Sequence, residues 1–69
     1  MNMHLKLSTR ETQVLKLIAY EHNAKEIANK LFLSQHTVIT YKRKLMSKMQ
    51  VRNIAGLVRV GFEYGILTA

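Results

Sequence analysis

The sequence contains no cysteine and no proline, and it has only three glycines among its 69 residues. Without cysteine, neither a disulfide nor a thiolate metal site can reinforce the fold. The three histidines, His4, His22 and His36, lack metal-ligand spacing, so we expect no metal site and no cofactor. No linker or low-complexity segment divides the chain, which we therefore interpret as one domain, residues 1–69.

Membrane spans and catalytic motifs are missing as well. No apolar run approaches the roughly 20 residues of a membrane-spanning helix, and no signal peptide is present. The four glutamates are scattered, and the sequence has neither a glycine-rich phosphate loop nor a plausible nucleophile–base pair. We therefore expect a cytoplasmic protein that is not an enzyme and does not enter a membrane.

Positive charge is what the sequence has in excess. Eleven lysines and arginines face four glutamates, which gives a net charge of +7 and a pI of 10.2. No acidic residue lies between Glu26 and Glu63, where the basic residues are Lys30, Lys42, Arg43, Lys44, Lys48, Arg52 and Arg59. A stretch of one sign attracts a polyanion, although a solvated basic surface has the same composition.

Capping residues divide the chain into four expected helices. Residues suited to N-caps precede each of them: Ser8, Asn23, Ser34 and Asn53. Glu11 and Glu26, each three residues after its cap, complete capping boxes, and Gly65 stops the last helix. The helices are expected at about residues 9–20, 24–32, 35–49 and 54–64, after a leader of residues 1–7. The fold class is accordingly all-α.

The expected third helix has an apolar face and a polar, basic face. The apolar stripe recurs every three or four residues: Val38, Tyr41, Leu45 and Met49. At about 100° per residue, the opposite face consists of His36, Thr40, Arg43 and Ser47, with Ile39 and Lys44 beside it. Tyr41 is expected to be a buried ring with a hydrogen-bonded hydroxyl. Together with the preceding short helix around Ala28, this pattern is typical of a helix-turn-helix.

The polar face suits the major groove of duplex DNA, which is about 12 Å wide and admits one helix. Arg43 carries a fork of donors that fits guanine, whereas Ile39 and Thr40 offer methyl groups to thymine. We predict base contacts at His36, Ile39, Thr40 and Arg43. An ordinary exposed arginine is the alternative for Arg43, and the edge of the core is an equal alternative for Ile39.

The expected fourth helix is more apolar than one buried face requires. Six of the nine residues from Ile54 to Phe62 are apolar. A helix that is apolar beyond one stripe needs cover on a second side, and a second copy of a small domain can supply it. Leu57 fits the core, so we predict a homodimer contact at Ile54, Val58 and Phe62.

A series of short motifs runs through the chain. In order they are Leu7-Ser8-Thr9-Arg10-Glu11, Val14-Leu15, Lys25-Glu26-Ile27-Ala28, Leu31-Phe32-Leu33-Ser34, Thr37-Val38 and Lys48-Met49-Gln50-Val51-Arg52-Asn53. At these spacings the series resembles the LuxR-type (also called GerE- or NarL-type) helix-turn-helix domain of bacterial transcription regulators. The resemblance covers about residues 5–65.

The resemblance implies four helices, of which the third reads DNA and the fourth pairs two domains. It implies base contacts at Ile39, Thr40 and Arg43, and phosphate contacts at Lys25, Thr37 and Lys48. A local capping role is the alternative for Thr37. We also expect phosphate contacts from Lys44, which lies beside the outer face, and from Lys42. Lys42 lies nearer the buried stripe and is expected to extend outward along its apolar stem, with a solvated lysine as the alternative. The sequence departs from the family at Ile39, where a basic residue is common, at Tyr41, where histidine is common, and at Glu21-His22, where glycine is usual.

Two functions from different classes fit these features. The first is a transcription regulator, or the effector domain of one such as a two-component response regulator, that binds double-stranded DNA as a homodimer. The alternative is a protein-interaction module that contacts another regulator or RNA polymerase, with the basic surface incidental. Steep salt dependence of duplex binding is expected only for the first.

Overall fold

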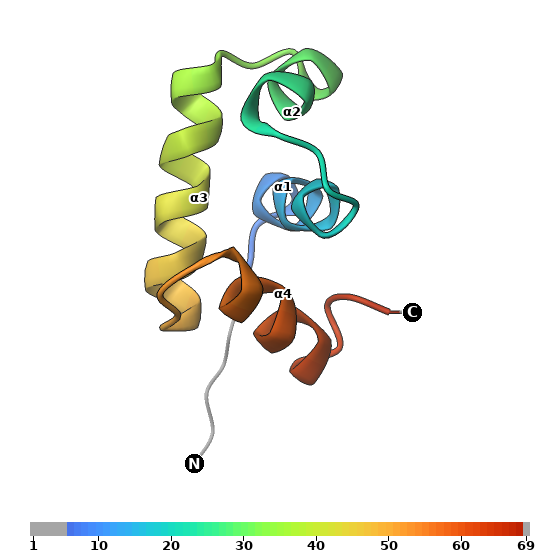
Figure 1. The fold of residues 1–69 in the computed structure, drawn as a ribbon, viewed down its shortest axis with the longest axis vertical. Helices are drawn as coiled ribbons and strands as arrows, with labels where there is room; N and C mark the ends of the chain where they lie inside the picture. Colours follow the sequence, from blue (N-terminus) through green and yellow to red (C-terminus); the bar gives the residue numbers. More distant parts are fainter. Residues whose placement is uncertain (1–5, 69) are drawn as a thin grey trace.

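The computed structural model describes residues 6–68 and arranges them as four helices. The helices are α1 (Thr9–Ala19), α2 (Ala24–Leu31), α3 (Gln35–Met49) and α4 (Ile54–Glu63). Most of the expected leader, residues 1–5, lies outside the described residues. The longest helix, α3, packs against each of the other three, with α2 at its N-terminal end and α4 near its C-terminal end (Figure 1).

Each helix begins where the capping residues predict. Ser8, Asn23, Ser34 and Asn53 are the four N-caps, and each side chain accepts a hydrogen bond from the backbone N–H three residues later. Glu11 and Glu26 complete the capping boxes by accepting the N–H of their N-cap residue, both at 2.8 Å. A cap of this kind contributes about 1 kcal/mol to stability, so the helix starts are determined locally.

Three helices end one residue earlier than expected, because Tyr20, Phe32 and Tyr64 serve as C-caps rather than as last helical residues. Phe32 adopts the left-handed conformation with a φ of 57°. Glu21, at the position where the resemblance anticipates glycine, has a φ of 67°. Side chains usually avoid this region, so the connections around α2 use strained backbone in place of glycine.

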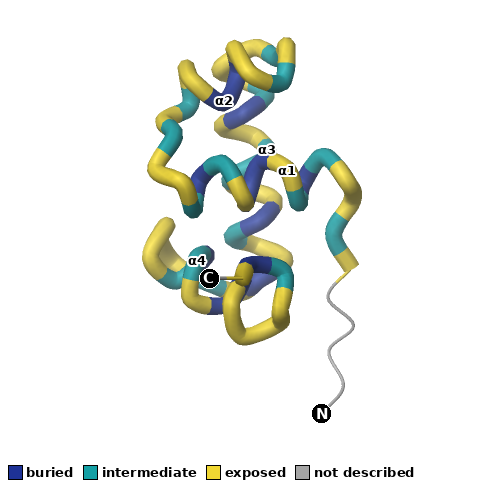
Figure 2. The backbone as a smooth tube through the Cα atoms, turned by 90° about the vertical axis from the view of Figure 1, so that its right-hand side faces the viewer, coloured by how far each residue is buried: buried dark blue, intermediate teal, exposed yellow. Residues whose placement is uncertain are grey.

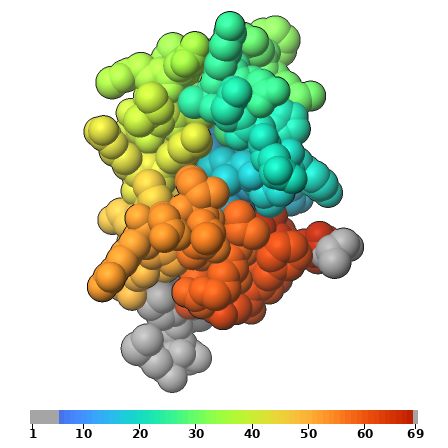
Figure 3. All heavy atoms as spheres, viewed as in Figure 1, coloured from blue at the N-terminus to red at the C-terminus, as the bar shows by residue number. Residues whose placement is uncertain are grey.

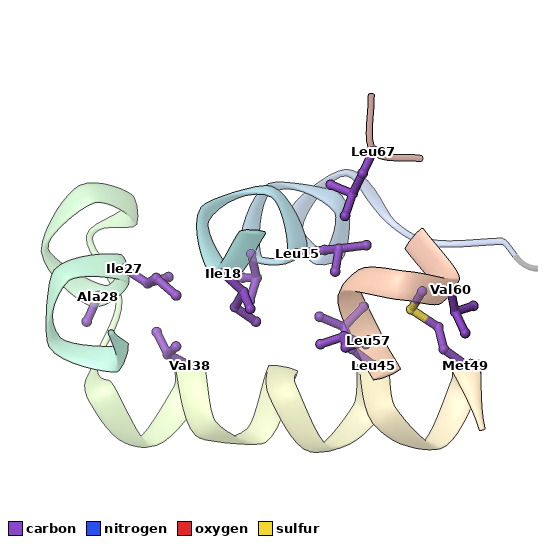
Figure 4. Packing of buried hydrophobic residues seen from close by; sticks show 11 residues of the cluster. Leu15, Ile18, Ile27, Ala28, Val38, Leu45, Met49, Leu57, Val60 and Leu67 are labelled. Atoms are coloured by element: carbon purple, nitrogen blue, oxygen red, sulfur yellow. The ribbon is translucent and has the colours of Figure 1, made fainter. Parts of the chain in front are cut away.

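The core lies between α3 and the other helices. It consists of Val14, Leu15 and Ile18 from α1, Ile27 and Ala28 from α2, Val38, Leu45 and Met49 from α3, Leu57 and Val60 from α4, and Leu67 (Figure 4). Buried positions recur along the helices with exposed positions between them (Figure 2). The apolar stripe is thus confirmed except at Tyr41. The expectation of a buried ring there is wrong, because Tyr41 lies at the edge of the stripe and is half-buried.

A segment after α4 closes the core. Gly65 turns the chain with a φ of 74°, and the N–H groups of Ile66 and Leu67 both donate to the carbonyl of Gly61, at 2.9 and 3.0 Å. Leu67 is buried and points toward Leu15 in α1 (Figure 4). Gly61 permits this contact, because a Cβ there would lie 2.7 Å from a Leu67 methyl carbon. We call residues 65–68 the closing segment; the sequence predicts only its glycine turn.

Candidate nucleic-acid interface

The outer face of α3 is exposed, as the helical spacing predicts. His36, Thr40 and Arg43 are exposed on one side, while Val38 and Leu45 are completely buried on the other. The space-filling view shows side chains of α3 projecting from one edge of the molecule (Figure 3). A projecting helix is the shape that enters a groove, whereas a small-molecule site is concave.

Two side chains of this face present apolar surface. Ile39 is 41% exposed and lies outside the core cluster, so of the two alternatives for this residue the structure supports the exposed one. The hydroxyl of Thr40 donates to the carbonyl of His36 at 3.1 Å, within its own helix. That bond uses the hydroxyl proton and leaves the methyl group of Thr40 as the more available part of the side chain.

The expected phosphate contacts lie on the flanks of this face and on α2. Lys25 and Lys44 are exposed, whereas Lys42 and Thr37 are half-buried. The hydroxyl of Thr37 accepts a hydrogen bond from the Ser34 hydroxyl at 2.9 Å. Its own proton is still available, because a hydroxyl that accepts can also donate. Thr37, Lys44 and Lys48 recur at helical spacing and share one flank of α3.

Lys48 has a partner that the sequence analysis missed. Its ammonium Nζ donates to Glu11 Oε1 at 2.9 Å and to the carbonyl of Lys6 at 3.5 Å, while 44% of its side chain is exposed. Glu11 itself is only 5% exposed. The signal that points to it is its spacing from Val14, Leu15 and Ile18, which places it on the buried face of α1, where a carboxylate needs a partner.

The carboxyl of Glu11 stays ionised at neutral pH. Burial raises its pKa, but the hydrogen bonds from the Ser8 backbone and from Lys48, together with the Lys48 charge, lower it further than burial raises it. The net result is a pKa below the ordinary 4.5. At physiological pH both partners are therefore charged, and their ion pair links the start of α1 to the last turn of α3.

The expected dimer face of α4 is partly uncovered. Ile54 is 40% exposed and Phe62 is 47% exposed, whereas Leu57 is completely buried, as the sequence analysis expects. Val58 is half-buried and packs against the core cluster. Ile54 and Phe62 are therefore available to a partner, and Val58 lies between the core and this face.

The remaining features of the described residues concern metal-binding clusters, membrane-spanning helices and hollows in the surface. Within residues 6–68 no group of three histidine or acidic side chains gathers at one point, and no helix is long and apolar enough to cross a bilayer. A hollow of about 580 Å³ lies beside the closing segment, lined by Lys16, Ala19, Tyr20, Phe62, Gly65, Ile66, Leu67 and Thr68. It involves no residue of α3 and is thus separate from the candidate interface.

A short helix, a tight turn and a longer helix with an exposed polar face define a helix-turn-helix protein of the kind that binds duplex DNA. The comparison with known families agrees. A model described as "Bacterial regulatory proteins, luxR family" matches residues 5–61. The chain belongs to this family and carries its DNA-binding helix-turn-helix domain.

Individual relatives show how much of a regulator this domain represents. The chain is 42% identical over 52 residues to BvgA of Bordetella pertussis, covering 75% of this chain and 25% of that protein. It is 39% identical over 62 residues to the uncharacterized response regulatory protein YgeK of Escherichia coli, covering 90% and 42%. A crystal structure of the response regulator ChrA of a heme-sensing two-component system matches with a TM-score of 0.87 and 26% identity, covering 96% and 33%. The chain spans less than half the length of each.

Proposed function

We propose that the protein binds duplex DNA sequence-specifically as a transcription regulator, with α3 in the major groove. The observation that carries the proposal is the division of α3 into a buried stripe at Val38 and Leu45 and an exposed polar face around Thr40 and Arg43. The proposed role is binding without catalysis, and its proposed location is the cytoplasm, where bacterial DNA lies.

Contacts to bases and to phosphates have separate roles in this proposal. Arg43 donates two hydrogen bonds to a guanine, Ile39 and Thr40 contact a thymine methyl, and His36 reaches a neighbouring base. The phosphate contacts hold the domain in register on the duplex, and the residues proposed for them are Lys25, Thr37, Lys42, Lys44 and Lys48. The base contacts then distinguish operator from other DNA.

We further propose a homodimer through α4 that becomes stronger on DNA. Ile54 and Phe62 supply exposed apolar surface, with Val58 at its edge. A two-fold axis through this face would place two copies of α3 in successive major grooves, about 34 Å apart, on an inverted repeat. The uncovered surface on one helix is small, so dimerisation of the free domain is expected to be weak.

Selection of bound duplexes from a random library tests the function directly. We expect an inverted repeat to be enriched, and the affinity for it to fall steeply with salt, because each lysine that neutralises a phosphate adds about −0.9 to the slope of log K against log salt. Random duplex of equal length is the control. Binding that enriches no sequence, or that does not depend on salt, would contradict the proposal.

A contact with another protein, such as RNA polymerase, is a second candidate. The observation that favours it is the hollow beside the closing segment, where Tyr20 and Phe62 expose 75% and 47% of their surface. Leu67, which lines this hollow, lies on the side of α1 away from α3 (Figure 4), so a partner there would leave α3 free. Binding of purified RNA polymerase to wild type but not to Tyr20→Ala would support it.

A further inference from the structure

Two glutamates in this chain occupy the same place in their helices but different surroundings. Glu11 and Glu26 are both the third residue of a helix, and both accept the N–H of the N-cap residue at 2.8 Å. Glu26 does so while exposed to solvent and, within residues 6–68, without an ion pair. Glu11 does so while buried and bonded to Lys48. Capping a helix therefore requires neither the burial of Glu11 nor its ion pair with Lys48.

The additional contact fixes a cation at the candidate interface. Lys48 shares its flank of α3 with Thr37 and Lys44, and Lys44 precedes it by one turn. Glu11 and the Lys6 carbonyl take two of the three donors of the Lys48 ammonium, which leaves one for a further acceptor. A free lysine would lose much of its rotamer freedom on reaching a phosphate, whereas a lysine already held by two acceptors has less freedom to lose.

We propose that Glu11 is a positioning residue for DNA binding: it holds the Lys48 ammonium at the flank of α3 so that Lys48 reaches a backbone phosphate with its side chain already ordered. The inference rests on the proposed function and assigns a part of it to a buried residue of α1. Glu11 itself does not touch DNA in this arrangement.

The direction in which Glu11→Gln changes the affinity for DNA separates positioning from a simple effect of charge. Glu11→Gln raises the net charge of the chain from +7 to +8, and long-range attraction alone then predicts tighter binding. Loss of positioning predicts weaker binding, because Lys48 must be ordered on the DNA. Glu26→Gln makes the same change of charge at the other capping box and is the matched control.

The experiment uses the full chain and the selected inverted-repeat duplex. We expect Glu11→Gln to bind about three- to tenfold more weakly than wild type, as suits one side chain that must be newly immobilised. Glu26→Gln should bind as well as wild type or better. Lys48→Ala should weaken all duplexes and lower the salt slope by about one, and adding Glu11→Gln to Lys48→Ala should cause no further loss.

Circular dichroism first establishes that each variant is folded at the assay temperature. If Glu11→Gln is not folded, NMR relaxation of the Lys48 side chain in the free wild-type domain tests the positioning role instead. We expect the Cε–Nζ group of Lys48 to be more ordered than that of Lys44. Equal mobility of the two lysines, tighter binding by Glu11→Gln, or an unchanged salt slope in Lys48→Ala would overturn the positioning role. Failure of wild type to bind any duplex would instead remove the proposed function, and this inference with it.

Discussion

Arg43 combines exposure, charge and position in a way that no other arginine of this chain does. It projects from α3 three residues after Thr40, on the face opposite the buried Val38 and Leu45. Arg59, by contrast, lies on α4 and pairs with Glu63 at 2.8 Å. The two arginines carry equal charge, so a difference in DNA binding between their alanine variants reflects where each arginine lies.

We expect Arg43→Ala to reduce discrimination by about 1–3 kcal/mol at one base position in each half-site, because the proposed bidentate contact to guanine would be lost. Competition binding with operator duplexes substituted one position at a time measures the effect. Arg59→Ala is the control and should leave the base preference unchanged. If Arg43→Ala weakens operator and random duplex equally, Arg43 contacts only phosphate.

Within α4, the apolar side chains are divided between the core and an exposed face. Leu57 and Val60 are buried in the core, while Ile54 and Phe62 are exposed. Val58 packs against the core cluster, so a charge at Val58 would disturb folding as well as any dimer. Ile54 is the cleaner position at which to test the interface.

We expect Ile54→Asp to remain folded and to lose cooperative occupation of the two half-sites, because a carboxylate would be buried in the dimer contact. Footprinting of an inverted repeat measures cooperativity, with circular dichroism as the folding control. Cooperative protection of both half-sites by the folded variant would exclude α4 as the interface. Gln13→Asp, on the exposed side of α1, makes the same change of one negative charge and is the matched control.

The closing segment depends on the missing side chain of Gly61. A Cβ at this position would lie 2.7 and 3.0 Å from two carbons of Leu67 and 3.4 Å from Leu15. We expect Gly61→Ala to lower the free energy of unfolding by about 1–3 kcal/mol through overpacking, measured by urea denaturation. In the Leu67→Ala background the same change should cost less, because the clashing atoms are gone. Equal costs in both backgrounds would locate the strain elsewhere.

Elements with local causes were predictable from the sequence. All four helix starts follow from side chains within three residues of the cap, and the α3 stripe follows from helical periodicity. The helix ends were less predictable, because Phe32, which ends α2, adopts a backbone conformation that residues with a side chain disfavour. The Glu11–Lys48 pair joins residues 37 apart, and no local pattern specifies which lysine meets a buried glutamate. The exposed face of α3 was predictable, but the fixing of one of its cations was not.

At the scale of the whole molecule, Glu11 links stability to pH. Its pKa in the folded state lies below the ordinary 4.5, so the unfolded chain binds the proton more readily and acid favours unfolding. The stabilisation is therefore complete above about pH 5 and is lost as the pH falls through the folded-state pKa.

We expect the free energy of unfolding of wild type to fall more steeply below pH 5 than that of Glu11→Gln, which cannot titrate there. Urea denaturation at a series of pH values measures both. Glu26→Gln removes the exposed capping glutamate of α2 and leaves Glu11 in place, so it should keep the steep pH dependence of wild type. Parallel pH profiles for wild type and Glu11→Gln would show that the ion pair does not contribute to acid stability.

The position of Leu67 near the end of this sequence also has a consequence for folding during synthesis. A chain leaves the ribosome from its N-terminus, and domains generally fold as units during or after synthesis. Here the residue that covers Leu15, in the first helix, comes after the last helix has been made. The nascent chain therefore cannot complete its core until the closing segment has emerged.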